Sequence, residues 1–325
     1  MPHVVVAGKI HPSGIALLKD AEGFTYDYVE EVSEPSYAPL VAGADALVLR
    51  TQPLSAATVA QAGRLRIVSR HGVGYDAVHL PSLNERGIAL AIVGDVNSVS
   101  VAEHAMMLLL ALAKRTNVAD RAVRTGDWKW RDRLDASELA GKHLLIIGFG
   151  RIGRHLARLA SAFGMKVMAH DPYLERLGWP DQSAAMAYDL DAALGWADAV
   201  SVHAPKGERP LMGERELRAM KRSAVLINTS RGGVVDEAAL VAALAENRLA
   251  GAGLDVFETE PPARDNPLFG FDQVILSPHI AGLTAECAER MAISSVQNII
   301  DFFAGRIDEA LVVNARELTA GRADS

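Results

Sequence analysis

Short apolar runs alternate with segments of helical periodicity along the whole chain. In the first part, the runs that predict buried strands are Val4–Ala7, Ala46–Leu49, Ile67–Ser69 and Ala89–Ile92, with Thr25–Val29 as a weaker candidate. The intervening segments that predict helices are Ser13–Asp20, Ser55–Ala62 and Pro81–Glu85. Such alternation is typical of parallel sheets that are covered by helices.

The second part repeats this alternation more regularly. Six strands are expected here, at Leu144–Ile147, Lys166–His170, Ala199–His203, Ala224–Asn228, Ala252–Val256 and Val274–Ser277. Helical patterns, including Arg151–Phe163 and Glu237–Asn247, separate the earlier strands. Six parallel strands with helical crossovers form the doubly wound dinucleotide-binding plan. We therefore predict the α/β class, with two doubly wound parallel-sheet domains: a Rossmann domain and a smaller, flavodoxin-like domain.

The remaining segments set the expected domain limits. Val99–Arg124 contains no Gly or Pro and predicts one long helix, after which Gly126 begins an aromatic, charged loop. A last helix is expected at about 284–304, and the tail that contains Leu311–Asn314 is expected to pack back on the first domain. We therefore expect one discontinuous domain, residues 1–97 plus about 290–325, and a second domain at 98–289.

Composition and charge narrow the function classes. The 325 residues carry a formal net charge of −7, so no basic excess favours binding to nucleic acid. The single Cys287 excludes an internal disulfide and a multi-cysteine metal site, and we expect no metal. The longest strongly apolar run, Ala105–Ala113, is far shorter than the ~20 residues of a membrane span, and the N-terminus does not resemble a secretory signal. We expect a cytoplasmic protein with no membrane partner.

A glycine-rich turn predicts a cofactor site. The residues that fit the pattern G-x-G-x-x-G are Gly148, Phe149, Gly150, Arg151, Ile152 and Gly153. The pattern is weak alone, but here it lies between a predicted strand and a predicted helix. Its three glycines permit the tight turn, the approach of a pyrophosphate and close packing of the helix on the strand. The N–H groups at the start of the helix then face the phosphates.

An acidic residue follows at the position that selects the cofactor. Asp171 ends the next predicted strand, 18 residues after Gly153, where a carboxylate can bind the adenosine ribose hydroxyls and repel a 2′-phosphate. Pro172 and the two residues after it offer no arginine for such a phosphate. We expect NAD rather than NADP. The structural alternative is that Asp171 only forms a turn before Pro172.

Three polar residues follow later strands of the second domain. They are Arg231, Glu260 and His279, and the carboxyl ends of the strands place them at one crevice. Reduction of a 2-oxo acid needs a cation for the carboxylate, a proton donor for the carbonyl oxygen and a carboxylate that orients the donor. Each residue has an ordinary alternative: an arginine that neutralises a surface carboxylate, a solvated glutamate and a buried, satisfied histidine.

Four motifs in order resemble the D-isomer-specific 2-hydroxyacid dehydrogenases over essentially the whole chain: Gly141–Gly153, Asn228–Asp236, Gly253–Pro261 and Ser277–Gly282. The resemblance implies that Arg231 binds the substrate carboxylate, that His279 is the acid/base and that Glu260 pairs with it. It further implies that Asp255 bonds the nicotinamide carboxamide. The other implied cofactor-cleft residues are His203, Ala204, Pro205, Thr229, Ser230, Ala281 and Gly282.

The resemblance also points to a substrate loop in the first domain, within Ser69–Asp76. The substrate-binding residues that it implies there and nearby are Arg50, Arg70, His71, Gly72, Val73 and Gly74. His71 stands where many relatives carry a small residue, and Tyr75 where an aliphatic one is common, so substrate choice stays open. Arg50 and Arg70 occupy positions where phosphoglycerate-oxidising relatives carry arginines, and the alternative is that both are simply solvated.

These observations predict an NAD-dependent D-2-hydroxyacid dehydrogenase acting on D-3-phosphoglycerate or on hydroxypyruvate and glyoxylate. A homodimer is implied by the family, with Trp128 or Trp130 reaching the partner subunit; the alternative is that these tryptophans only anchor their loop. The other functions considered are an NAD-sensing, corepressor-like binding module and phosphite oxidation. Formate oxidation is disfavoured because those relatives carry Gln where Glu260 stands.

Overall fold

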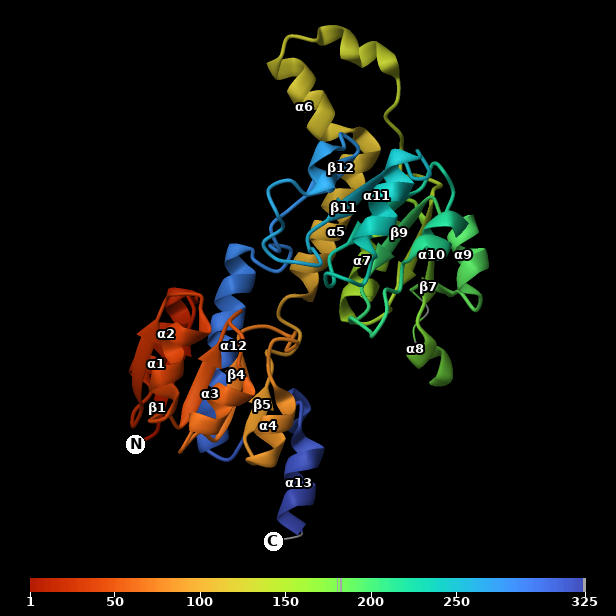
Figure 1. The fold of residues 1–325 in the computed structure, drawn as a ribbon. Coiled ribbons are helices and arrows are strands. Elements are labelled where there is room, and N and C mark those ends of the chain that lie inside the picture. The colour runs from red at the N-terminus through yellow and green to blue at the C-terminus, as the bar shows by residue number, and fades with distance from the viewer. Residues whose placement is uncertain (180, 182, 324–325) are drawn as a thin grey trace. The chain divides into compact units, whose positions relative to one another are not determined.

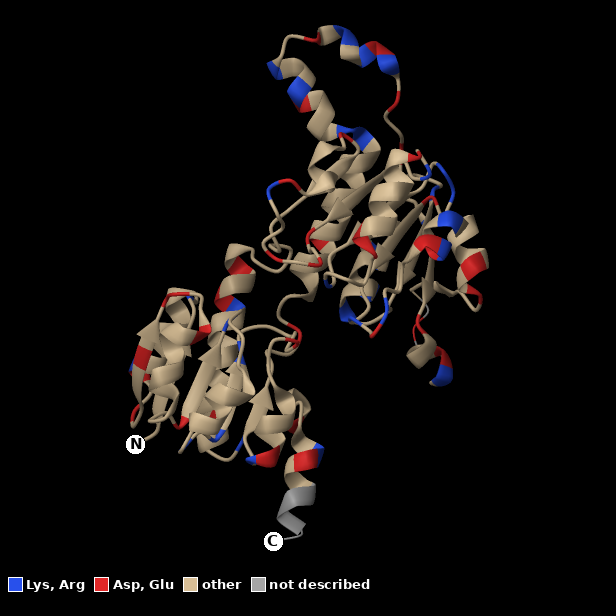
Figure 2. Ribbon diagram, in the orientation of Figure 1, with Lys and Arg blue, Asp and Glu red and all other residues tan. Residues whose placement is uncertain are grey.

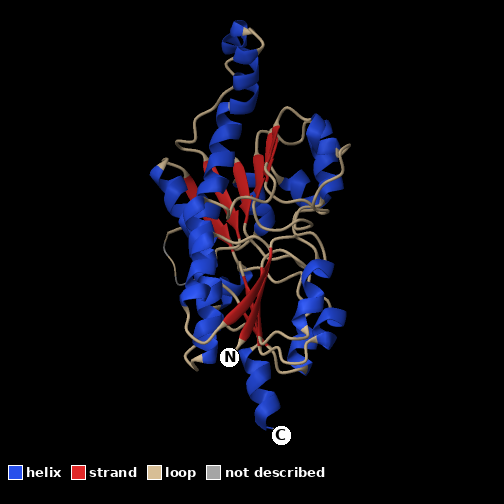
Figure 3. Cartoon of the chain, turned by 90° about the vertical axis from the view of Figure 1, so that its left-hand side faces the viewer, coloured by secondary structure: helices blue, strands red, loops and turns tan. Residues whose placement is uncertain are grey.

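A computed structural model describes residues 1–179, 181 and 183–323 (Figure 1). The chain forms two compact units, the first built from residues 1–97 and the chain from Leu283 onward, the second from Ser98–Gly282. Each unit has its own parallel sheet, and Figure 3 shows helices on both sides of the sheets. The predicted α/β class with two doubly wound parallel sheets is confirmed.

Unit 1 has a five-stranded sheet in the flavodoxin-like order β2-β1-β3-β4-β5. The strands are β1 (His3–Ala7), β2 (Thr25–Val29), β3 (Ala46–Leu49), β4 (Ile67–Arg70) and β5 (Ala89–Ala91). The helical segments are α1 (Pro12–Asp20), α2 (Glu34–Val41), α3 (Ala56–Gln61), α4 (Leu80–Glu85), α12 (Ala285–Phe303), η3 (Glu309–Leu311) and α13 (Ala315–Ala323). The weak pattern of β2 is explained by its place at the sheet edge, where none of its side chains is fully buried.

The C-terminal segment completes unit 1. Helix α12 packs beside α1 so closely that a Cβ on Gly14 would lie 2.9 Å from the Cβ of Ala292. Val296 and Ile299 of α12 join the core on that face of the sheet. The tail then forms an antiparallel bridge between Ala91 and Val312. Because α12 is one continuous helix that begins at Ala285, the division between the units falls before its first turn rather than near residue 290.

Unit 2 has a seven-stranded sheet in the order β12-β11-β10-β9-β6-β7-β8, one strand more than the sequence predicted. The strands are β6 (His143–Ile147), β7 (Lys166–His170), β8 (Ala185–Met186), β9 (Ala199–Val202), β10 (Val225–Asn228), β11 (Gly251–Leu254) and β12 (Val274–Leu276). The helical segments are α5 (Ser98–Lys114), α6 (Thr116–Arg124), η1 (Trp128–Arg133), α7 (Arg151–Ala162), α8 (Pro172–Arg176), α9 (Leu190–Trp196), α10 (Glu214–Ala219), α11 (Glu237–Ala245) and η2 (Pro267–Gly270). The unpredicted β8 is a two-residue edge strand, too short to show a hydrophobic period.

The predicted long helix is interrupted. It forms α5 (Ser98–Lys114) and α6 (Thr116–Arg124), and Arg115 between them has a left-handed φ of 56°. The interpretation of one helix was wrong because neither Gly nor Pro marks the break. Along α5, buried residues such as Leu108 and Leu109 pack on the sheet of unit 2, whereas α6 buries little besides Val118 and Ala122.

The segment α6–η1 forms an arm that extends beyond the sheet of unit 2 (Figure 1). Acidic and basic residues alternate along it (Figure 2), and Arg124 pairs with Asp120 at 2.8 Å. The side chains of Trp128 and Leu134 are 67% and 88% exposed.

Among the described residues, no helix is long and apolar enough to cross a membrane.

Candidate active site

The glycine turn after β6 lets neighbouring backbone, and the phosphates of a dinucleotide, come close to its own backbone. Gly148 has a φ of 91°, and a Cβ there would lie 2.7 Å from the backbone of His203. A Cβ on Gly153 would lie 2.4 Å from the carbonyl oxygen of Gly148. A Cβ on Gly150, in contrast, would meet nothing within 4 Å, and this N-terminus of α7 has no side-chain cap. The first N–H groups of α7 therefore fit the phosphates of a dinucleotide.

Asp171 is fixed beside this turn. Its Oδ2 accepts the N–H of Phe149 at 2.9 Å, and its Oδ1 accepts the N–H groups of Tyr173 and Leu174 at 3.0 and 3.1 Å. The carboxylate thus caps α8 and also contacts the glycine turn. A fixed negative charge at this place suits ribose hydroxyls and opposes a phosphate group.

Two unpartnered polar atoms lie at the carboxyl ends of neighbouring strands. Nδ1 of His203, after β9, and Oγ1 of Thr229, after β10, are buried and have no hydrogen-bond partner among the described residues. Burial lowers the pKa of His203 to about 4, so its ring is neutral near pH 7. An unpaired buried polar group costs about 1–3 kcal/mol, and a ligand that completes it offsets this cost. Both atoms fit a cofactor bound at the adjacent glycine turn.

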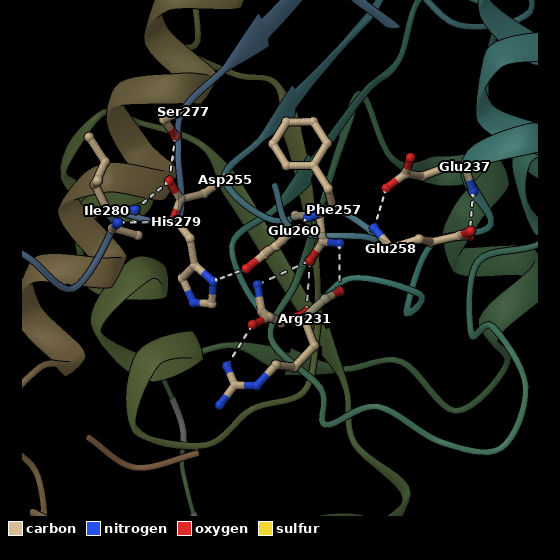
Figure 4. Close-up of polar contacts among 12 residues, drawn as sticks. Arg231, Glu237, Asp255, Phe257, Glu258, Glu260, Ser277, His279 and Ile280 are labelled. Carbon is tan, nitrogen blue, oxygen red and sulfur yellow. Dashed lines mark hydrogen bonds and ion pairs between the residues drawn. The ribbon is translucent and has the colours of Figure 1, made fainter. Parts of the chain in front are cut away.

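His279 and Glu260 form a direct pair. The Nδ1 atom of His279 lies 2.7 Å from Oε2 of Glu260, while Oε1 of Glu260 accepts the N–H of Phe257 at 3.0 Å. Figure 4 shows the ring of His279 turned toward Glu260. The two side chains are 49% and 36% exposed and border a cavity of about 510 Å³. Its apolar lining includes Phe257, Pro262, Phe269, Leu276 and Pro278.

Arg231 lies in a tightly packed turn after β10. Asn228, only 2% exposed, donates to the carbonyl oxygen of Arg231 at 3.1 Å and accepts the N–H of Ser230 at 3.0 Å. A Cβ on Gly232 would lie 1.6 Å from the carbonyl oxygen of Phe257, so only glycine fits there. Because β10, β11 and β12 are parallel neighbours, the loops that carry Arg231, Glu260 and His279 leave the same edge of the sheet.

Asp255 is held by the loop that carries His279. Its side chain is fully buried, and it accepts the hydroxyl of Ser277 at 2.5 Å and the N–H groups of Ile280 and Ala281 at 2.9 and 2.8 Å. The structure therefore directs this carboxylate into the loop that carries His279. The expected bond to the nicotinamide carboxamide stays a prediction.

In unit 1, Arg50 follows β3, Arg70 is the last residue of β4, and His71 follows it. Arg70 donates to the carbonyl oxygens of Gly74 and Leu49 at 2.7 and 3.0 Å, which holds the loop 70–74 in place. His71 is 7% exposed, and its Nε2 has no partner among the described residues. Burial, assisted by the charges of Arg50 and Arg70, lowers the pKa of His71 to about 4.

The other residues expected in this loop have distinct environments. Gly72 has a φ of 152° and open space where a Cβ would be, whereas Val73 packs against the cluster that contains Cys287.

Among the described residues, no group of three or more His, Cys, Asp or Glu side chains could hold a metal ion.

Comparison with known proteins agrees with these features. Residues 106–281 match the family model described as "D-isomer specific 2-hydroxyacid dehydrogenase, NAD binding domain". The chain is 39% identical to a glyoxylate reductase of Korarchaeum cryptofilum, with 96% of each protein covered. It is 37% identical to a D-3-phosphoglycerate dehydrogenase of Archaeoglobus fulgidus, a match that covers 80% of this chain and 50% of that protein.

A solved structure has the same architecture. The NADPH-dependent glyoxylate/hydroxypyruvate reductase of Sinorhizobium meliloti superimposes with a TM-score of 0.85. The two chains are 30% identical, and the match covers 97% of this chain and 98% of the other. The similarity therefore extends over both units and is not confined to the sheet that carries the glycine turn.

Proposed function

We propose that this chain, which belongs to the D-isomer-specific 2-hydroxyacid dehydrogenase family, prefers NAD and that Arg231, Glu260 and His279 are its catalytic residues. Members of this family that it matches are NAD(P)-dependent oxidoreductases that act on CH–OH groups, and so is this chain. The reaction is the reversible conversion of a 2-oxo acid, a hydride and a proton into a 2-hydroxy acid. Bound NADH would supply the hydride to C2.

The pair of His279 and Glu260 is the observation that carries this proposal. Glu260 holds Nδ1 of His279 at 2.7 Å, which leaves Nε2 of the ring for the substrate. In the reductive direction, Nε2–H of His279 donates its proton to the carbonyl oxygen at C2 as the C–O double bond becomes a C–OH group. The guanidinium of Arg231 binds the substrate carboxylate, because its planar fork matches two oxygens.

The preference for NAD is supported by Asp171. Its carboxylate is fixed by three backbone N–H groups beside the glycine turn, where the 2′-phosphate of NADP would meet a negative charge. The Sinorhizobium meliloti reductase is named as NADPH-dependent, so overall similarity does not decide the cofactor. The fixed charge of Asp171 is the local feature that supports a preference for NAD.

Two substrate classes fit the proposal. Glyoxylate is supported by the Korarchaeum cryptofilum glyoxylate reductase, which this chain matches over 96% of its length, and hydroxypyruvate is supported by the Sinorhizobium meliloti glyoxylate/hydroxypyruvate reductase. D-3-phosphoglycerate is supported by the Archaeoglobus fulgidus relative, of which only half is covered. We assign the substrate to the loop 70–74 and the neighbouring Arg50, and the neutral, buried His71 favours a substrate with a hydrogen-bonding group at C3.

A panel of 2-oxo acids tests the proposal. NADH oxidation at neutral pH is measured with hydroxypyruvate, glyoxylate, pyruvate, 2-oxoglutarate and 3-phosphohydroxypyruvate, and then with NADPH in place of NADH. We expect turnover of glyoxylate, hydroxypyruvate or 3-phosphohydroxypyruvate, with higher kcat/KM for NADH than for NADPH. No turnover of any acid with either cofactor contradicts the proposed reaction.

We also propose a cytoplasmic homodimer. Trp128 in the α6–η1 arm and Leu134 directly after it are mostly exposed in the single chain. A second copy would bury such side chains. The free, buried thiol of Cys287 suits a reducing compartment. Light scattering is expected to give twice the chain mass, and Trp128→Ser should shift the protein toward the monomer. A wild-type monomer at micromolar concentration contradicts the homodimer.

A further inference from the structure

We propose that Ser100 and His104 of α5 are positioning residues that hold both ends of the loop carrying His279. This loop, residues 277–281, is called the histidine loop below. The hydroxyl of Ser100, 4% exposed, donates to the carbonyl oxygen of Ala281 at 2.7 Å. Nε2 of His104 lies 2.8 Å from Oγ of Ser277. The inference rests on the proposed role of His279.

The direction of the hydrogen bonds follows from the number of protons available. The hydroxyl of Ser277 has one hydrogen and donates it to Oδ1 of Asp255, which as a carboxylate can only accept. Oγ of Ser277 must therefore accept from His104, so Nε2 of His104 carries a hydrogen. The series runs from His104 through Ser277 to the fully buried carboxylate of Asp255, which lies 3.6 Å from Nε2 of His104.

Asp255 also binds the backbone of His279 and of the two residues after it. Its main-chain oxygen accepts the N–H of His279 at 2.8 Å, and its carboxylate accepts the N–H groups of Ile280 and Ala281. His279 has a left-handed φ of 54°, a conformation that is strained for a non-glycine residue. Such a conformation persists only where the surroundings fix it, and hydrogen bonds to Asp255 fix the histidine loop at Ser277, His279, Ile280 and Ala281.

Helix α5 is a suitable support for this loop. Residues four apart lie on the same face of a helix, so Ser100 and His104 point toward the histidine loop together. The intervening Ala102 and the following Ala105 and Leu108 are buried in the core of unit 2. A site that is held from a packed helix is more precise than one held by loops alone.

Substitution of these two residues tests the inference. His104→Leu and Ser100→Ala should each lower kcat by roughly 10–100-fold, because small misplacements of reacting groups carry penalties of that size, while KM for the 2-oxo acid changes far less. His104→Gln keeps an N–H donor near the position of Nε2 and should recover most of the loss. Lys114→Gln, at an exposed position on the same helix, is the control and should match the wild type.

A second measurement needs neither turnover nor cofactor. Ring-nitrogen NMR shifts of the cofactor-free protein should show Nε2 of His104 protonated. An unprotonated Nε2, or wild-type kcat in folded His104→Leu and Ser100→Ala, overturns the inference. An inactive wild-type enzyme would instead contradict the proposed function, and the NMR result would still decide whether the hydrogen bonds run as inferred.

Discussion

The imidazole of His279 is held by Glu260, whose second oxygen is itself held by the backbone. The distance from Nδ1 of His279 to Oε2 of Glu260 is 2.7 Å, and Phe257 donates its N–H to Oε1 of the same carboxylate at 3.0 Å. The carboxylate therefore cannot rotate freely, and the ring keeps one orientation. This relationship gives His279 a defined face for a substrate and underlies the first prediction.

Glu260→Gln should lower kcat for the preferred 2-oxo acid by about tenfold or more. An amide preserves the shape of the side chain but removes the negative charge beside the imidazole, and acid/base groups of this kind contribute roughly 10²–10⁴ in rate. Steady-state kinetics with NADH measure the effect. Glu258→Gln is the control, because Glu258 lies two residues away and pairs with the start of α11 at Glu237. Equal kcat values for both variants would refute the role of Glu260.

Asp171→Ala should raise the ratio of kcat/KM for NADPH over NADH by roughly tenfold or more, because it removes the charge that repels a 2′-phosphate. The change also removes the cap of α8, which costs about 1 kcal/mol of stability. Asp189→Ala is the matched control, since Asp189 caps α9 by accepting the N–H of Ala192 at 3.2 Å. If the cofactor ratio is the same in both variants, Asp171 does not select the cofactor.

His71→Phe should lower the preference for hydroxypyruvate over pyruvate. Under the proposed substrate assignment, a C3 hydroxyl would pair with the buried Nε2 of His71 and a methyl group would leave it unpaired, and such a difference discriminates strongly between substrates. We expect the ratio of the two kcat/KM values to fall by about tenfold or more. The exposed His79→Gln is the control. An equal fractional loss of kcat/KM for both acids would show that His71 does not contact the group at C3.

Protein stability should fall as the pH is lowered from about 6.5 toward 4. The folded-state pKa of His71 is about 4, below the value of about 6.5 for a free histidine, so the unfolded chain binds a proton in this range that the folded chain does not. At pH 5 this difference amounts to on the order of 2 kcal/mol for His71. The pKa of His203 is lowered to about 4 by burial and acts in the same direction.

Urea unfolding at pH 7 and pH 5 measures this effect. His71→Phe removes one of the two groups, so its free energy of unfolding should depend less on pH than that of the wild type. The same pH dependence in both proteins would mean that His71 titrates normally in the folded state.

The features that sequence predicts best here are those whose cause is local. The strand before Gly148 and the helix that begins at Arg151 follow from apolar runs and glycines, and the fold class and the family assignment are confirmed. The break at Arg115 has no local signal, because it arises where the support of the sheet ends and not from a helix-breaking residue.

Residues that act through tertiary contacts are the hardest to find in a sequence. His104 lies in an apolar helix and has the pattern of an ordinary half-buried residue, and its relation to Ser277, 173 positions away, appears only in the folded chain. Asp255 stands in a recognisable motif, yet its buried carboxylate serves the backbone around His279 in this structure. A motif identifies such a residue, whereas its contacts define what it does.

The most direct test of the whole account is the turnover of His279→Ala with NADH and the preferred 2-oxo acid, measured together with the Kd for NADH by fluorescence titration. We predict that kcat falls by roughly 10²–10⁴, as expected for the loss of an acid/base group, while the Kd for NADH stays close to that of the wild type. A folded variant that binds NADH and turns over at a near wild-type rate would contradict the assignment of His279 as the proton donor.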